Sequence, residues 1–222
     1  MIKSRFILAG ALLAAMGAAH AGSFTVPVAV VSDYDFRGLT QSDEDPALQV
    51  GLTYTGDSGF YVGTWASNID FPGADADVEV DLFAGFAGGD AAESFGYDIG
   101  AVLYAYPGSS DFDEVVELYA GITRGWFGAK LWFSPDNYDS TSWYAEANGT
   151  FPLPQDFSIG VHAGYNFGDY WTGAEYFDYS VGVSKSFGNF AFNVKWVDTD
   201  IDGVDTGRVI GSISTTLPWM AE

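Results

Sequence analysis

The sequence of 222 residues contains no cysteine and few basic residues: eight lysines and arginines stand against thirty aspartates and glutamates. Without cysteine, no disulfide can stabilise the chain, although its length allows a sizeable core without one. The formal net charge of −22 leaves no basic patch, so nucleic acid is not an expected partner. After the first 21 residues, no apolar run approaches the roughly 18 residues of a membrane-spanning helix.

An N-terminal targeting segment is the first feature that the sequence does contain. Residues 1–21 combine Lys3 and Arg5, an apolar run over residues 6–16 and the ending Ala-His-Ala. A charged start, a short apolar core and a small-residue cleavage site are typical of a secretory signal peptide. The apolar core is too short to anchor the chain in a bilayer. We therefore expect residues 1–21 to be removed on export and residues 22–222 to form a single domain.

Alternation of apolar and polar residues with a period of two runs through most of the chain. Between Phe157 and Tyr165, for example, Phe157, Ile159 and Val161 share one face, and His162 lies on the other. This period indicates β-strands. The sequence predicts twelve of them, over residues 24–32, 47–54, 60–68, 77–86, 94–105, 115–123, 126–133, 142–151, 157–166, 177–187, 190–197 and 208–217. Most prolines, including Pro152, fall between the predicted strands, as ladder hydrogen bonding requires.

The connections between these strands alternate between long and short. The long ones, such as residues 33–46 and 167–176, are acidic, whereas short ones such as 124–125 and 188–189 are tight turns. Twelve antiparallel strands with short turns at one end and longer loops at the other are typical of a transmembrane up-and-down β-barrel. A soluble lipocalin-like barrel is the alternative, but aromatic residues near many strand ends favour the two aromatic girdles of a membrane barrel.

In a membrane barrel the apolar face contacts lipid and the polar face lines the lumen. Parity then predicts the pore-lining residues Glu79, Asp81, Asp98, Glu117, Lys130, Glu146, His162, Lys195 and Arg208, with Asp178 on the same face. Lys130 lies on the strand between those of Glu117 and Glu146, so we expect an interior ladder of these three charges. Tyr61, Trp65 and Tyr119 also point inward and are expected to narrow the lumen. Lys185 has lipid-facing parity, so its amine should reach the headgroups at the rim beside the turn that follows Phe187.

Several segments resemble the TorF-type family of porin-like proteins of the Gram-negative envelope. They are SDYDFRGLTQS in residues 32–42, SGFYVGTWASNIDF in residues 58–71, YDIGAVLYAYPG in residues 97–108 and EVVELYAGIT in residues 114–123. The likeness is strongest over residues 24–124. It implies a β-barrel in the outer membrane of a Gram-negative bacterium, with porin activity that is itself inferred for the family. It implies no catalytic or cofactor-binding residue.

Catalytic and metal-binding patterns are weak in this sequence. A serine hydrolase would have to use His162, and Ser158 on the same strand is roughly 13 Å away, too far for proton transfer. No nucleophile-elbow, zinc-protease or phosphate-loop motif is found, so we expect no enzyme and no cofactor. Residues 198–205, DTDIDGVD, resemble a calcium loop, but the glutamate that would complete it is replaced by Val209. Diffuse divalent-cation and lipopolysaccharide contacts are the expected surface partners.

The charge distribution suggests a role for Arg37. Twenty of the thirty acidic residues lie in or beside the longer connections, so the predicted mouth is negative and should attract small cations. Arg37 is surrounded there by acids of its own segment, Asp33, Asp35 and residues 43–45. Its guanidinium is expected to pin the first loop against the barrel wall or inside it. We therefore predict a passive, cation-preferring channel for small solutes. The alternative is a non-conducting structural or lipopolysaccharide-binding barrel.

Overall fold

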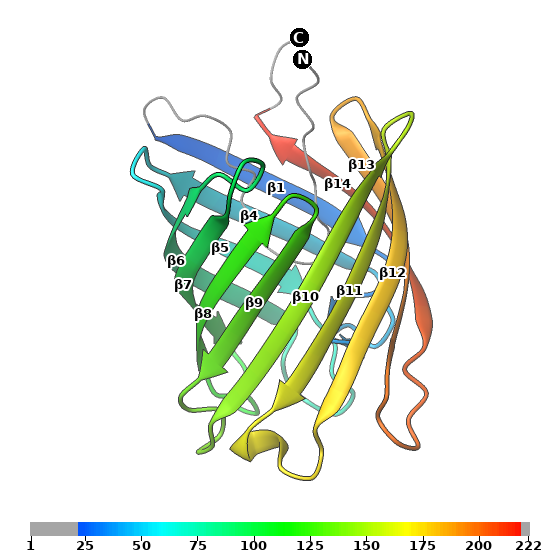
Figure 1. Ribbon diagram of the computed structural model, residues 1–222. Coiled ribbons are helices and arrows are strands. Elements are labelled where there is room, and N and C mark those ends of the chain that lie inside the picture. The colour runs from blue at the N-terminus through cyan, green and yellow to red at the C-terminus, as the bar shows by residue number, and fades with distance from the viewer. Residues whose placement is uncertain (1–21, 219–222) are drawn as a thin grey trace.

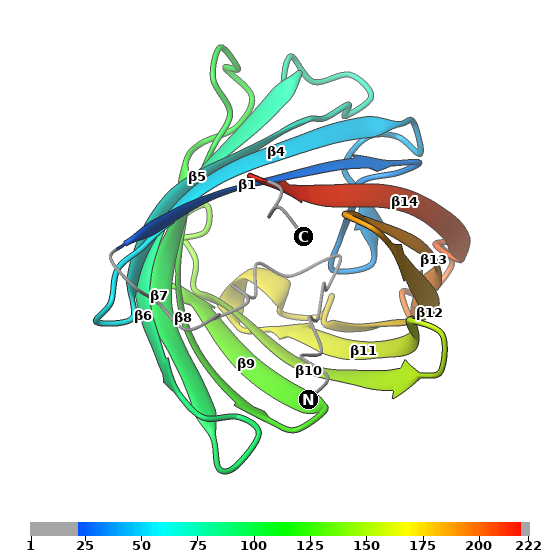
Figure 2. The same ribbon diagram turned by 90° about the horizontal axis from the view of Figure 1, so that it is seen from above.

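The computed structural model describes residues 22–218, and these form one closed antiparallel β-barrel (Figure 1). Each of its twelve long strands pairs with its neighbours, and β1 closes the ring by pairing with both β4 and β14. Figure 2 shows the strands as a ring seen along the barrel. Over these residues no helix has the length and apolar character needed to cross a bilayer. The predicted fold class and number of strands are confirmed.

The predicted strand boundaries are within three residues of the observed ones. The barrel strands are β1 Ser23–Val31, β4 Ala47–Thr55, β5 Phe60–Asn68, β6 Val78–Gly89, β7 Gly96–Ala105, β8 Val115–Arg124, β9 Phe127–Ser134, β10 Ser142–Leu153, β11 Phe157–Phe167, β12 Tyr176–Phe187, β13 Phe190–Thr199 and β14 Arg208–Leu217. Contrary to the prediction, Pro152 lies inside β10. It pairs there with Ser158 beside the short turn, near the end of the ladder, where a missing N–H is tolerated.

The alternation of the sequence becomes an apolar outside and a polar inside. Large apolar side chains such as Val181, Val183 and Val194 are exposed on the outer surface. On β11, Val161 is likewise exposed, whereas His162 turns inward to hydrogen-bond with inward-facing neighbours. An apolar outer wall around a polar interior is the arrangement of a membrane barrel and is opposite to that of a soluble one.

The two ends of the barrel differ, and they are named here by their connections. The loop end, at the bottom of Figure 1, carries the six long connections, and the turn end carries the five short ones. Three short elements escaped prediction, all at the loop end: β2 Asp35–Phe36, β3 Leu39–Thr40 and the 3-10 helix η1 Asp169–Trp171. The predicted signal peptide, residues 1–21, lies outside the described residues.

Candidate functional site in the barrel lumen

The first long connection, residues 32–46 and called L1 below, folds into a small hairpin. β2 and β3 pair through Asp35↔Thr40 and Phe36↔Leu39, which leaves Arg37 and Gly38 as a two-residue turn. Both have positive φ, 51° and 84°, as a type I′ turn requires. Asparagine, aspartate or glycine is the usual choice at the first of these positions. The presence of arginine in a left-handed conformation indicates that its side chain has a function there.

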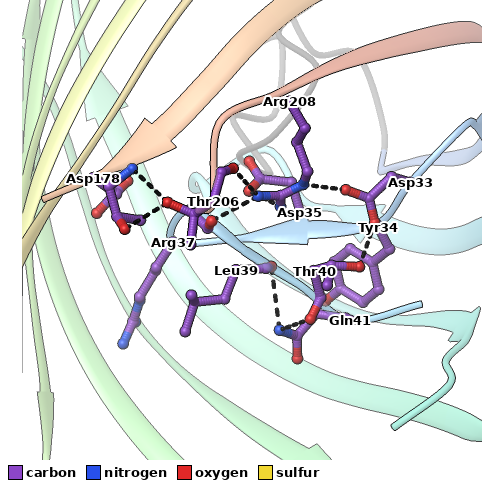
Figure 3. A network of polar contacts seen from close by, with 12 residues as sticks. Asp33, Tyr34, Asp35, Arg37, Leu39, Thr40, Gln41, Asp178, Thr206 and Arg208 are labelled. Atoms are coloured by element: carbon purple, nitrogen blue, oxygen red, sulfur yellow. Dashed lines mark hydrogen bonds and ion pairs between the residues drawn. The ribbon is translucent and has the colours of Figure 1, made fainter. Parts of the chain in front are cut away.

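One side of the L1 hairpin is fixed to β13 and β14. Lys195 Nζ of β13 lies 2.6 Å from Asp35 Oδ2, and Arg208 Nη2 of β14 lies 2.8 Å from Asp35 Oδ1. Arg208 also pairs with Asp33 through Nε and donates to the carbonyl of Gly38 at 2.8 Å. Figure 3 shows Arg208 meeting Asp33 and Asp35 while the side chain of Arg37 points away from them.

The Arg37 side chain at the tip of the hairpin reaches the opposite wall. Arg37 Nη2 lies 2.6 Å from Glu117 Oε2 on β8, and Tyr104 of β7 donates to the same oxygen at 2.9 Å. The guanidinium also lies 4.2 Å from the ring centroid of Tyr144 on β10. In the order of the ring, β8 lies six strands from β14, which makes the two diametrically opposite. L1 therefore crosses the full width of the lumen.

The partner of Arg37 differs from the one that the sequence suggested. Its ion pair is with Glu117, eighty residues away, and not with the acids that surround it in the sequence. Both side chains are nearly buried, with 11% of Arg37 and 5% of Glu117 exposed. The predicted loop-pinning role is compatible with this geometry and remains a prediction.

A second layer of interactions crosses the wall of β5 to β9. Lys130 Nζ lies 2.7 Å from Asp98 Oδ2, and Asp98 also accepts a hydrogen bond from Tyr61. The Tyr61 and Tyr119 hydroxyls are hydrogen-bonded to each other, and Lys130 lies 4.4 Å from the Tyr119 ring centroid. Tyr61 and Tyr119 are both buried inside the barrel, and Trp65 packs against the same cluster. These inward rings narrow the lumen.

The predicted ladder of Glu117, Lys130 and Glu146 is wrong. Lys130 and Glu146 are register partners, but Lys130 extends the other way, towards Asp98. Gly121 stands between Lys130 and Asp98 in the sheet, and the Lys130 side chain lies close over it. A side chain at that position would block this path.

His162 of β11 connects two further acids of the lumen, Asp178 directly and Glu146 through Asn148. Its Nε2 lies 2.8 Å from Asp178 Oδ1, and its Nδ1 lies 2.8 Å from Asn148 Oδ1. The Asn148 amide nitrogen donates to Glu146, which fixes its oxygen towards the histidine. The Tyr144 hydroxyl also lies 3.0 Å from His162 Nε2, so this histidine belongs to one hydrogen-bonded group with Tyr144 and Asp178.

Glu79 and Asp81 lie two residues apart on β6, and neither has a basic partner. No lysine, arginine or histidine of the described chain forms an ion pair with either carboxylate. Glu79 is 3% exposed and accepts a hydrogen bond of 3.4 Å from Tyr34 of L1. Asp81 Oδ1 is buried without a hydrogen-bond partner among the described residues. The wall beside L1 thus holds two buried carboxyl groups without a basic partner.

The opposite part of the wall carries small polar side chains. The inward positions of β11, β12 and β14 near the turn end include Ser158, Gly160, Ser184, Ser212 and Ser214. A Cβ atom added at Gly160 would have no heavy atom of another residue within 4 Å. Open space therefore remains next to this strand.

Hydrogen bonds join some of the long loops at the loop end. Across the described range, no three histidine, cysteine, aspartate or glutamate side chains gather into a metal site. In the segment that resembles a calcium loop, Asp198 accepts a hydrogen bond from Thr206. Asp75, in another loop, accepts hydrogen bonds from the Ser109 hydroxyl and from Ser110, and these lower the pKa of Asp75 well below its usual range.

Lys185, predicted at a rim, does lie there. Its Nζ donates to the Gln155 carbonyl, in the turn between β10 and β11, and lies 4.1 Å from the Phe157 ring centroid. Its place beside a short turn confirms that part of the register.

Sequence reasoning placed Glu117, Lys195 and Arg208 in the lumen, but it missed the L1 hairpin and the pairing of these three residues with it. A local signal was present, because Arg-Gly lies between the short pairs Asp-Phe and Leu-Thr, which is the pattern of a two-residue hairpin turn. The partners, in contrast, are separated from L1 by 80 to 175 residues. Nothing local to L1 identifies them.

The sequence matches one protein family over residues 15–216, and that family is described as "Bacterial protein of unknown function (Gcw_chp)". The match does not carry the TorF name, so that resemblance remains a prediction. No curated protein matches the chain.

Solved structures with similar folds are outer-membrane channels. The KdgM porin aligns with a TM-score of 0.58 and 9% identity over 89% of this chain and 99% of its own. The NanC porin aligns with a TM-score of 0.53 and 7% identity over 87% of this chain and 98% of its own. The COG4313 outer membrane channel from Pseudomonas putida F1 aligns with a TM-score of 0.53 and 12% identity over 90% of this chain and 97% of its own. At these identities the likeness concerns the fold alone.

Proposed function

We propose that this chain, which belongs to the Gcw_chp family of bacterial proteins of unknown function, is an outer-membrane channel for passive diffusion of small solutes. The apolar outer wall suits a lipid environment, and the fold is shared with porins such as KdgM and NanC. Residues 1–21 serve as the signal peptide for export, and residues 22–222 form the barrel domain. The long acidic loops face the cell exterior, where divalent cations and lipopolysaccharide are their surface partners.

Cation preference follows from the charge pairing in the lumen. Four basic side chains point inward, Arg37, Lys130, Lys195 and Arg208, and each already forms an ion pair with a carboxylate. Glu79 and Asp81 are left without a basic partner. This imbalance is the observation that carries the proposal, because a narrow passage with excess negative charge favours cations. One KdgM structure holds oligogalacturonate, and that carboxylate-rich sugar suits this lumen poorly.

The experiment is a planar-bilayer recording of the purified protein in a KCl gradient. Steady conductance steps with a reversal potential of the sign for K⁺ support the proposal. Replacing Glu79 and Asp81 together by Gln and Asn keeps their shape and removes both carboxyl groups. We expect that variant to conduct with reduced cation preference. Replacing Asp57 by Asn, in a turn at the other end of the barrel, is the matched control and should leave the reversal potential almost unchanged. A channel that prefers Cl⁻ would contradict the proposal.

A non-conducting barrel is the second candidate, and the position of L1 favours it. L1 crosses the lumen between opposite walls and is held on both sides by buried ion pairs. If L1 closed the passage completely, the protein would be silent in the bilayer at any amount inserted. In that case conductance should appear only when L1 is removed, for example by replacing residues 34–44 with a short glycine linker.

A further inference from the structure

A buried asparagine at the loop end has no hydrogen-bond partner. Asn166 on β11 points inward and is 0% exposed, yet neither its amide oxygen nor its amide nitrogen has a partner among the described residues. Burying an amide without a hydrogen-bond partner is costly. Such a group therefore indicates a polar molecule that belongs beside it.

Two further unpaired atoms lie in the same part of the barrel. Asp178 is 1% exposed, and its Oδ2 has no partner, although its Oδ1 accepts from Tyr144. Trp171 of η1 has an unpaired buried Nε1. Tyr176 connects the three residues: it is the register partner of Asn166, precedes Asp178 by two positions on one strand face, and contacts the Trp171 ring at 5.2 Å between centroids.

A row of aromatic rings leads from the surface to this place. Tyr138 and Tyr170 are each more than 40% exposed, and their ring centroids are 6.3 Å apart. Tyr170 contacts Trp171 at 4.9 Å, and Trp171 contacts Tyr176. The Tyr176 hydroxyl then donates to the Arg37 carbonyl at the tip of L1. The four rings form one continuous row of contacts from the exposed Tyr138 to the buried Tyr176 beside L1.

The unpaired atoms select the chemistry of a ligand. Asn166 Oδ1 and Asp178 Oδ2 are acceptors, whereas Asn166 Nδ2 and Trp171 Nε1 are donors. A metal ion would satisfy the acceptors only, and an anion would meet the Asp178 carboxylate. A hydroxyl group both donates and accepts, and the flat C–H faces of a sugar ring pack on aromatic faces.

We propose that Asn166, Trp171 and Asp178, reached along Tyr138, Tyr170 and Tyr176, form a binding subsite for neutral carbohydrates at the mouth of the barrel. This subsite deepens the proposed channel function by naming a solute class and rests on that function for its role. A sugar hydroxyl enters the polar group around Asn166 while the pyranose rings follow the aromatic path. The Asp178 carboxylate excludes acidic sugars.

Isothermal titration calorimetry on the detergent-solubilised protein tests the subsite. Maltotriose, sucrose and glucose are the neutral probes, and trigalacturonate is the acidic one. We expect at least one neutral probe to bind and trigalacturonate to give no heat of binding. Asn166→Ala and Trp171→Ala should each weaken binding by tenfold or more. Trp143→Ala is the control, because Trp143 is an outward-facing aromatic of the same end, in contact with Phe133 at 4.3 Å between ring centroids, and should leave the affinity unchanged.

Circular dichroism and thermal unfolding check that each variant is folded. If Trp171→Ala does not fold, Trp171→Phe replaces it, because phenylalanine keeps an aromatic ring and removes the N–H. Failure of all three neutral probes to bind the folded wild type would overturn the subsite and leave ordered water as its occupant. Equal binding of trigalacturonate would also overturn it. Calorimetry does not require conduction. A protein that conducts without binding sugar therefore contradicts the subsite alone, and one that binds sugar but is silent in bilayers contradicts the channel.

Discussion

Replacing Arg37 by Ala should release L1 from the far wall of the lumen. The substitution leaves Glu117 buried, 5% exposed, with the Tyr104 hydroxyl as its remaining donor. Removing one partner of a buried ion pair costs about 3–5 kcal/mol, because the other charge stays uncompensated. A loss of 3 kcal/mol in the docked state of L1 increases its undocked fraction by roughly 100-fold. Lys195 and Arg208 still hold Asp33 and Asp35, and Arg208 and Tyr176 still donate to the carbonyls of the turn. We therefore expect the hairpin to loosen on the side that faces β8, and not the whole loop to leave the lumen.

Two companion variants separate the effect of losing the ion pair from the effect of the backbone conformation at residue 37. Arg37→Gly removes the same ion pair but suits the positive φ of residue 37, which costs a non-glycine residue about 1 kcal/mol or more. It should therefore open L1 less than Arg37→Ala. The double variant Arg37→Ala with Glu117→Gln removes the orphaned charge as well. It should be closer to the wild type than Arg37→Ala alone, which a double-mutant cycle measures.

Limited chymotrypsin digestion and single-channel conductance are the two assays. Phe36 and Leu39 lie in the hairpin, so cleavage there reports undocking, and a loosened hairpin should also give a larger unitary conductance. Identical cleavage and conductance for the wild type and Arg37→Ala would refute the reasoning. The ion pair with Glu117 would then contribute no more than an exposed pair, under about 1 kcal/mol.

Three further predictions test other parts of the lumen and the loops. Gly160→Trp should lower the unitary conductance because its side chain enters open space in the lumen, whereas Gly211→Trp, also unobstructed but with outward parity on β14, should not. Asn148→Leu should lower the temperature of thermal unfolding, because it removes the amide that links His162 to Glu146 and leaves both without that hydrogen bond. The lowered pKa of Asp75 means that its tie to Ser109 contributes stability above the ordinary aspartate pKa and is lost only as pH falls through the lowered value; Asp75→Asn should therefore speed amide exchange at Ser110 at pH 5, where the wild type stays protected.

The barrel wall was predictable because its signal is local. Every second residue of a strand shares a face, so the sequence around Phe157 and His162 already decides which side chains turn inward. The same parity places Tyr61 and Tyr119 inside, and the structure confirms both positions. Twelve strands and an apolar exterior follow from this period and from the spacing of the turns.

The contacts inside the lumen were not predictable in this way. Asp35 pairs with Lys195 across 160 residues, and only closure of the ring brings the two together. For Lys130, the register with Glu146 was right and the partner was wrong. The curvature of the barrel brings inward-facing side chains closer together. Because Gly121 has no side chain, Lys130 can extend over it to Asp98, two strands away. Strand parity predicts which side chains point into the lumen. Which of several nearby acids a lysine or arginine then pairs with depends on which neighbouring side chains are small.

The distribution of the rare basic residues gives L1 its significance. Residues 22–222 contain six lysines and arginines, and four of them point into the lumen. Three of those four, Arg37, Lys195 and Arg208, hold L1 across the barrel. A chain with so many acids would repel an acidic loop such as L1 from an acidic interior unless cations were placed where the loop must dock. Most of the few cations of this chain thus pair with L1, while Glu79 and Asp81 beside it have no basic partner. The proposed cation preference rests on this arrangement.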